Sequence, residues 1–352
     1  MKKKVILASL TLIAILGLFY GTVQAKTLAP GLKVGVLISY SGPISFAASY
    51  QRVGVELAIQ DLQGKVAVSA NYIDVGDNDA ETKAQALKIK NLNADLIFAP
   101  LESEKAKRAL RYLSKEDLIA VSALDESLGN GNLFRLASTT SQDSYVLAHY
   151  IAQQNPKSVA VISADDDYSR LVGKSVAFGL AMRGISGVSS LDIDETKVIR
   201  SNQSETVVLS SMEQSVSFFE RVGSWITKRT NYLVPGNLAN YSMFDWSRNL
   251  EGSLGLIAFD EVPQAFRQRV ASKMAKPELL STPNSPMFGI AKRTYDAVML
   301  AAEQLRGDGA VDLGQWDVFN KDGYYQKQKY TVVRYSKFGT FAPIGVFDPK
   351  KP

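Results

Sequence analysis

The stretch LKVGVLISYSGPISF, residues 32 to 46, decides the fold of this chain. It begins with the apolar run Lys33 to Ser39, which has the composition of a strand buried on both faces. The turn residues Ser41-Gly42-Pro43 follow, and apolar positions from Tyr50 to Ala58 then recur at helical spacing. Gly54 lies on the same helical face and is expected to let helix and sheet approach closely. A strand, a turn and a helix in this order begin a strand-helix-strand unit of a parallel sheet.

The same alternation runs along the rest of the chain. After Thr139 the pattern restarts with a helix that Ser141 or Asp143 is expected to cap. The further strands are expected at Asn71 to Val75, Leu96 to Ala99, Leu118 to Ser122, Ser158 to Ser163, Gly187 to Leu191, Thr206 to Ser210, Tyr232 to Val234 and Gly255 to Ala258. Amphipathic patterns between them predict helices, among them one through Val216, Phe219, Val222 and Ile226 and a long one from Phe288 to Ala302. The sequence therefore predicts an α/β fold with two doubly wound, Rossmann-like lobes.

Residues 1–25 have the pattern of a cleaved signal peptide. Three lysines, Lys2 to Lys4, precede an uncharged apolar run from Val5 to Phe19, and Val23-Gln24-Ala25 offers small residues at the cleavage position. The 15-residue apolar run is shorter than the roughly 20 residues that a membrane-spanning helix needs. The mature chain is therefore expected to begin at Lys26 and to work in the periplasm.

Composition argues against several classes of function. Three of the five net positive charges lie in the leader, which leaves +2 on the mature chain and no basic stripe for nucleic acid. The chain has no cysteine and one histidine, His149, so it lacks most of the residues from which zinc sites and nucleophile-histidine triads are built. The acid clusters around Asp77 and Asp165 to Asp167 lack calcium-loop spacing and are interpreted as solvated turns. The protein is expected not to be an enzyme and to hold no metal or cofactor.

Four segments together resemble a known family. They are the opening stretch, the helix ending in ELAIQDLQG, the helix YDAVMLA at Tyr295 to Ala301, and a tail element built on Asp322-Gly323. Their order is similar to that of type I periplasmic solute-binding proteins of ABC transporters, in the branch of the leucine/isoleucine/valine-binding proteins. The resemblance covers the mature chain in element order. It implies a divergent member of that family.

The resemblance implies two lobes joined by a three-crossing hinge. The crossings are expected near Ala137 to Ser141, Ala258 to Val262 and Gln326 to Gln328. Lobe 1 then comprises residues 26–138 and 260–326, and lobe 2 comprises 139–259 and 327–352. A small polar ligand is expected in the cleft between the lobes, with hinge closure on binding and delivery by a monomer to an ABC permease in the inner membrane. The alternative is a ligand sensor or an envelope protein-interaction module on the same fold, without transport.

Loops at the carboxyl ends of the strands are the expected ligand-binding positions, because ligands of open parallel sheets collect there. Several of these residues have a second interpretation: the Ser41 loop is good turn chemistry, and Ser103 or Asp125 can cap a helix. The candidates are Ser41, Gly42, Phe46, Glu102, Ser103, Ala123, Leu124 and Asp125 from lobe 1, and Tyr168, Met212 and Asn237 from lobe 2.

Two departures from the family pattern bear on the ligand. The resemblance implies small hydroxyl residues for a ligand carboxylate and an acid for its ammonium, but Glu102 and Asp125 stand at the former places and Gly236 at the latter. This inverted polarity disfavours a standard branched-chain amino acid and favours a neutral polar or cationic molecule. The 14-residue connection from Asp192 to Glu205 is also short for a crossover helix, so lobe 2 is expected to be trimmed on one face.

Overall fold

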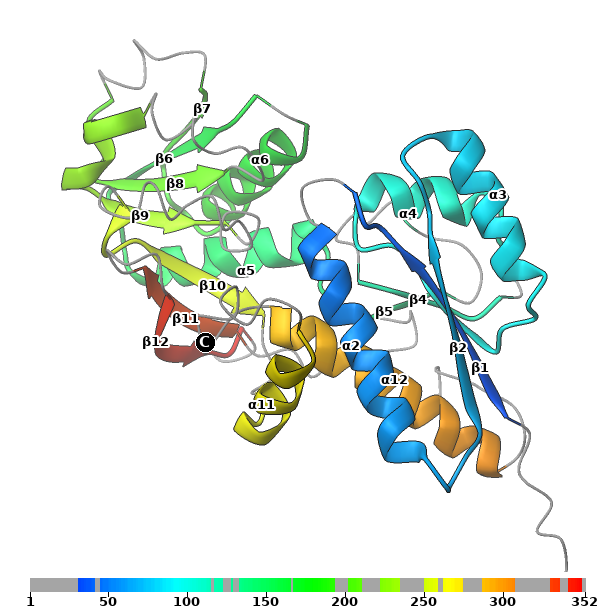
Figure 1. The fold of residues 1–352 in the computed structure, drawn as a ribbon. Coiled ribbons are helices and arrows are strands. Elements are labelled where there is room, and N and C mark those ends of the chain that lie inside the picture. The colour runs from blue at the N-terminus through cyan, green and yellow to red at the C-terminus, as the bar shows by residue number, and fades with distance from the viewer. Residues whose placement is uncertain are drawn as a thin grey trace, which may run out of the picture.

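The described residues form two β-sheets, which lie in different parts of the molecule (Figure 1). The computed structural model describes residues 31–41, 45–114, 117–122, 128, 133–165, 167–193, 202–210, 222–234, 250–258, 262–274, 287–307, 330–335 and 341–349. Within these residues the sheets have five and seven strands. The α/β fold predicted from the sequence is confirmed. None of the described helices is long and apolar enough to cross a membrane.

The first sheet is parallel throughout and has the strand order β2-β1-β3-β4-β5. Strand β1 pairs on both sides, so that Val36 lies beside Tyr72 on one neighbour and Phe98 on the other. The strands are β1 (Leu32–Ile38), β2 (Val68–Asp74), β3 (Leu96–Phe98), β4 (Ile119–Val121) and β5 (Leu133–Arg135).

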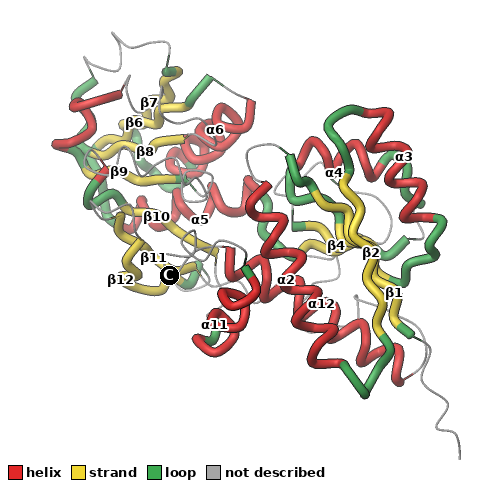
Figure 2. Tube along the Cα trace, viewed as in Figure 1, coloured by secondary structure: helices red, strands yellow, loops and turns green. Residues whose placement is uncertain are grey.

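Helices cover both faces of this sheet (Figure 2). Helices α2 (Ser45–Leu62) and α12 (Met287–Gly307) pack on one face, around Val34, Val36 and Ile38 of β1. Helices α3 (Asp79–Lys90) and α4 (Ser103–Leu110) pack on the other face, around Leu37. Helix α11 (Gln264–Lys273) closes an apolar cluster with α2 and α12. Because α2, α3 and α4 each follow a parallel strand of this sheet, their first turns lie at its carboxyl edge.

Gly54 permits a close approach, but its partner differs from the predicted one. A Cβ atom built at Gly54 overlaps the carbonyl oxygen of Ala291 and lies 3.0 Å from Cβ of Thr294, both in α12. The predicted contact between helix and sheet is therefore a contact between two helices. The apolar face of α2 is shared between the sheet and α12, which lies more than 200 residues later in the chain.

The second sheet is mixed, with the order β12-β11-β10-β9-β8-β6-β7. Its strands are β6 (Ser158–Ser163), β7 (Gly187–Asp192), β8 (Thr206–Ser210), β9 (Thr230–Leu233), β10 (Leu254–Ala258), β11 (Tyr330–Tyr335) and β12 (Phe341–Phe347). The first five run parallel, and β11 and β12 add antiparallel pairs at one side. Helices α5 (Thr140–Gln153) and α6 (Asp167–Ala181) pack on one face, and the 3₁₀ helix η1 (Gly223–Lys228) contributes to the cluster on the other.

The junction after β5 is the first of the three predicted crossings. Thr139 caps α5 in a capping box with Gln142, so the predicted caps Ser141 and Asp143 were wrong. Asp143 is instead buried, and its Oδ1 accepts hydrogen bonds from Ser138 Oγ (2.5 Å) and the Tyr330 hydroxyl (3.0 Å). One carboxylate therefore joins the crossing segment, α5 and β11.

Burial raises the pKa of Asp143 to about 6, although the two hydrogen bonds and the charge of Arg293 act in the opposite direction. Arg293, on α12, donates to the carbonyl oxygen of Leu136 at 2.8 Å. The crossing segment is thus also held by the helix that packs on the first sheet. Residues 259–261 and 326–329, which cover most of the other two predicted crossings, lie outside the described residues.

Candidate ligand-binding site

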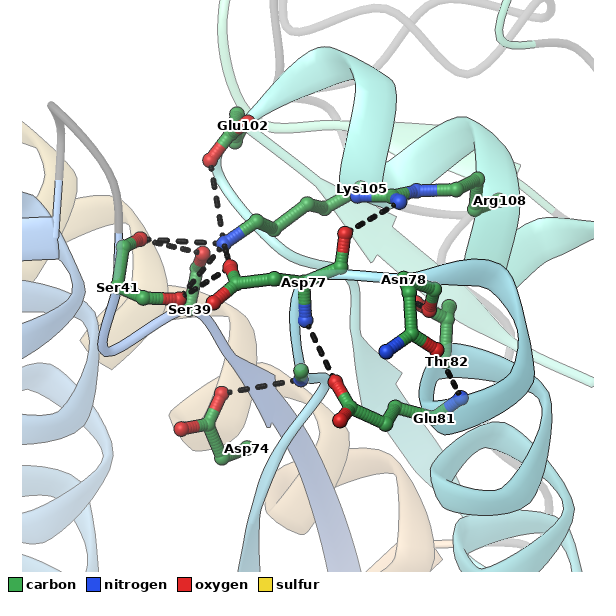
Figure 3. Close-up of polar contacts among 11 residues, drawn as sticks. Ser39, Ser41, Asp74, Asp77, Asn78, Glu81, Thr82, Glu102, Lys105 and Arg108 are labelled. Carbon is green, nitrogen blue, oxygen red and sulfur yellow. Dashed lines mark hydrogen bonds and ion pairs between the residues drawn. The ribbon is translucent and has the colours of Figure 1, made fainter.

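The loops that follow β1, β2 and β3 bring polar side chains together at the carboxyl edge of the first sheet (Figure 3). Ser41 follows β1, Asp77 follows β2, and Glu102 follows β3 immediately before α4. Because β1 is hydrogen-bonded to both β2 and β3, the three loops are neighbours. Lys105, one turn into α4, reaches all three, and these four residues are called the Lys105 cluster below.

Lys105 is buried, and its ammonium is enclosed by protein oxygen atoms. Nζ donates to the carbonyl oxygen of Ser41 at 3.1 Å, to Oγ of Ser41 at 3.0 Å and to Oδ1 of Asp77 at 2.7 Å. A lysine ammonium has three N–H donors, so each of them has an acceptor. The hydrogen bond from Lys105, with a second from Ser41, holds the pKa of Asp77 below its usual value.

Glu102 stands at the N-cap position of α4 but does not cap the helix. Its Oε2 lies 3.6 Å from Nζ of Lys105, which is an ion pair and is too long for a hydrogen bond. This oxygen is buried and has no hydrogen-bond partner among the described residues. The positive end of the α4 dipole and the Lys105 ammonium both stabilise a negative charge here. Glu102 is therefore a paired carboxylate with unused acceptor capacity.

The Asp77 loop is held in place by further hydrogen bonds. Gly76 has a φ of 71°, which a glycine adopts without strain, and its N–H donates to Oδ1 of Asp74 at 3.2 Å. The N–H of Asp77 donates to Oε2 of Glu81 at 2.9 Å, and its carbonyl accepts from Nη1 of Arg108 at 2.7 Å. Asp77 thus reaches Lys105 from a loop fixed on both sides.

The carboxyl edge of the second sheet has a similar group of charged residues, which is more exposed to solvent. Nη1 of Arg170, on α6, contacts Asp165 and lies 3.5 Å from Oδ2 of Asp192. The Arg170 side chain is 38% exposed, against 4% for Lys105. Among the described residues, no group of three or more histidines, cysteines or carboxylates could hold a metal ion.

Comparison with known proteins identifies the family. Residues 31–197 match the family model described as periplasmic binding protein. The leucine-specific-binding protein of Salmonella typhimurium is 22% identical over 323 residues, covering 86% of this chain and 84% of that protein. Over residues 31–197 the chain therefore matches the periplasmic binding proteins, and its described fold is that of the type I members. This is a family of extracytoplasmic binding proteins and not of enzymes, and the resemblance seen in the sequence is confirmed.

Solved structures support the same fold. The leucine binding protein LivK from Thermotoga maritima superposes with a TM-score of 0.71 at 14% identity, covering 91% of this chain and all of that one. An ABC transporter solute-binding protein from R. palustris, in complex with benzoate, gives a TM-score of 0.68 at 14% identity, with 90% and 96% covered. Relatives that share this fold therefore carry different ligands.

The sequence-predicted site residues fall into three groups in this binding protein. Ser41, Glu102 and Ser103 lie at the carboxyl edge of the first sheet. Ser103 is the first residue of α4 and not its cap, because Glu102 holds that position. Phe46 lies in the first turn of α2 and Tyr168 in that of α6. Gly42, Ala123, Leu124, Asp125, Met212 and Asn237 lie outside the described residues, as do residues 194–201 of the short connection. The ligand contacts of all these residues stay predictions.

Sequence reasoning missed the roles of Lys105 and Asp77. It treated Glu102 as a buried negative charge in need of pairing, and Lys105 supplies the partner three residues later. The available signal was the helical spacing: Lys105 lies beside Ala106 and Ala109 on the buried face of α4, where an unpaired lysine is disfavoured. Asp77 was interpreted as a solvated turn residue, and its side chain is indeed 68% exposed while it binds Lys105.

Proposed function

We propose that this protein is the solute receptor of an ABC importer and captures a small polar molecule between its two α/β halves. The Lys105 cluster carries the proposal, because it gathers ordered polar groups at the edge of a parallel sheet where such folds bind ligands. The leucine-specific, isoleucine-bound and benzoate-bound relatives support a receptor for small molecules. Hinge closure on the ligand then produces the loaded form for the permease.

The proposed lobe boundaries are residues 26–138 with 260–326, and 139–259 with 327–352. Two packing arrangements support this division. Helix α12 packs on the first sheet although it follows the second sheet in sequence, and β11 and β12 return to extend the second sheet. The chain thus passes between the halves after β5, after β10 and before β11.

The proposed location is the periplasm, after removal of residues 1–25, and the proposed partner is an ABC permease in the inner membrane. The leader pattern and the family of extracytoplasmic binding proteins support the location. A secreted protein isolated from the periplasm should begin at Lys26, which N-terminal sequencing measures directly.

Thermal-shift screening of residues 26–352 tests the receptor function. The panel contains amino acids, amides, polyamines, alcohols, and aromatic and short aliphatic acids. A true ligand at a hundredfold excess over its Kd stabilises the folded state by about 2.7 kcal/mol, because it binds that state alone. At least one compound is expected to raise the melting temperature in this way. A panel that leaves the melting temperature unchanged throughout argues against the receptor function.

A further inference from the structure

We propose that Lys105 and Glu102 select the chemical class of the ligand: the group that faces the first sheet is an N–H donor, such as an ammonium, amidinium or carboxamide, and not a carboxylate. Glu102 accepts this donor, and Lys105 positions Glu102. The inference rests on the proposed receptor function and adds the substrate class to it.

Lys105 has no donor to offer a ligand. Its three N–H groups are used by the carbonyl and hydroxyl oxygens of Ser41 and by the carboxylate of Asp77. Its side chain is 4% exposed, so a ligand anion can reach the ammonium only if the loop after β1 or β2 moves. The Asp77 loop is tied by Glu81 and Arg108, which resists that movement. The buried cation therefore serves the protein and not a ligand.

Glu102, in contrast, has acceptor capacity to offer. Its Oε2 is closed to solvent and lies 3.6 Å from Lys105, with no hydrogen bond among the described residues. The Glu102 side chain as a whole remains 22% exposed, so a ligand can approach this residue at its exposed part and not at the buried Oε2. An N–H donor there adds a charge-assisted hydrogen bond to the carboxylate.

The N-terminus of α4 is the competing site for an anion. The N–H groups in the first turn of α4 point to the same edge, and a helix N-terminus alone favours a ligand carboxylate. In this chain the Glu102 side chain already brings a negative charge to that end, and Asp77 lies on the other side of Lys105. A ligand carboxylate at α4 then meets a like charge, whereas an ammonium or amide meets an acceptor.

Matched head groups on common scaffolds test the proposal. The probes are benzamidine, benzamide and benzoate on the phenyl ring, and isoamylamine, 4-methylpentanamide and 4-methylpentanoate on the branched alkyl chain. Melting-temperature shifts from the amine, amidine or amides, with none from the two carboxylate compounds benzoate and 4-methylpentanoate, support the proposal. A shift by either carboxylate compound that equals that of its amide overturns it and leaves the receptor function standing. The absence of a melting-temperature shift with every amine, amidine and amide also overturns it. The receptor function is contradicted as well only if no compound of the whole screening panel shifts the melting temperature.

Variants then assign the effect to Glu102. Glu102→Gln keeps the shape and one acceptor but removes the charge, so it should raise the Kd of the cationic probes by about tenfold and change that of the amides less. Glu104→Gln is the matched control, because Glu104 is an exposed carboxylate on the same helix. Equal effects of the two variants overturn the assignment to Glu102.

Lys105→Met separates positioning from direct contact. The variant should not create or remove binding of benzoate or 4-methylpentanoate, because the ammonium donates to protein oxygens only. The proposal is overturned if the native protein binds a carboxylate compound and Lys105→Met does not, since this shows that Lys105 contacts the ligand directly. Circular dichroism establishes that each variant is folded before its Kd is compared.

Discussion

The two halves of the molecule carry the same charge pattern with opposite consequences. At each carboxyl edge one cation lies between two carboxylates: Lys105 between Asp77 and Glu102, and Arg170 between Asp165 and Asp192. Lys105 is buried and bonded to oxygens 28 and 64 residues away in sequence, whereas Arg170 is open to solvent. An exposed pair gains little because water competes with it, while a buried cation depends on its partners. Burial, and not the pattern of charges, therefore decides which cluster is structural.

Glycines on the helix that follows the first strand of each sheet show the same contrast. A Cβ at Gly54 of α2 overlaps the backbone of Ala291, which α12 holds in place. A Cβ at Gly173 of α6 overlaps only Oγ of Ser163, which a side-chain rotation can move. At this position the first half is therefore held by contact between helix backbones, whereas in the second half the contacting side chain can move aside.

The largest expected effect comes from removing the buried cation. Lys105→Ala should lower the free energy of unfolding by about 3 to 4 kcal/mol, because it leaves a cavity and leaves Glu102 without its cation. Urea denaturation monitored by circular dichroism measures it. Lys105→Met keeps the apolar stem and should cost less. A loss below about 1 kcal/mol for Lys105→Ala contradicts the structural role of the cluster.

The next largest effect is expected at Asp143, a buried carboxylate that is not paired with a lysine as Glu102 is. Asp143 has its pKa raised to about 6 by burial, so the folded state holds a proton that the unfolded state releases at lower pH. Its contribution to stability is therefore present below about pH 4 and is lost as pH rises through 6, by about 2 to 3 kcal/mol.

Asp143→Asn isolates this contribution, because the amide oxygen can still accept the bonds from Ser138 and Tyr330. The difference in unfolding free energy between native protein and Asp143→Asn should change across pH 4 to 7, in favour of asparagine at pH 7. Asp77 provides the contrast in sign: its lowered pKa makes its contribution present above pH 4 and lost as pH falls through the lowered pKa. A pH-independent difference for Asp143→Asn contradicts the assigned burial.

The paired glycines should differ by a smaller amount. Gly54→Ala should destabilise by about 1 to 2 kcal/mol, because two helix backbones must separate. Gly173→Ala should be close to neutral, since Ser163 can rotate and alanine favours the helix by about 1 kcal/mol over glycine. Shifts of the urea midpoint at constant slope measure both. Equal costs at the two positions contradict the difference between the halves.

The smallest effect is expected at Arg170. Arg170→Ala removes a solvent-exposed ion pair and should leave the urea midpoint unchanged within error, at low and at high salt. A loss of unfolding free energy as large as that of Lys105→Ala would show that solvent exposure does not explain the difference between the two clusters.

Much of the fold could be predicted because strong local patterns specify it. Strands β6 and β8 match their predicted bounds, and β1 is displaced by one residue. The three-residue strand β5 was missed because it is too short to show a period, and α11 because it buries only Phe266 and Val270. The antiparallel strands β11 and β12 were not predicted individually, because the sequence predicted only a tail element. The predicted helix through Ile226 ends as the 3₁₀ helix η1, while residues 211–221 lie outside the described part.

The candidate site was predicted in part. Its edge and the residues Ser41 and Glu102 follow from where parallel strands end. Lys105 was not identified, although it stands three residues after Glu102, because its acceptors come from two other loops. Asp143 was expected to act as a cap, and the tertiary contact with Tyr330 gives it a buried role instead.

The sequence by itself determined the class of fold, the order of its elements and the edge of the sheet at which a ligand is expected, because these depend on apolar periodicity within a few neighbouring residues. Only the tertiary structure decided that Lys105 is buried and Arg170 is exposed, that Gly54 faces α12, and that Asp143 joins the crossing to β11. Burial and hydrogen-bond partners depend on segments far apart in the chain, which come together only when the apolar faces pack.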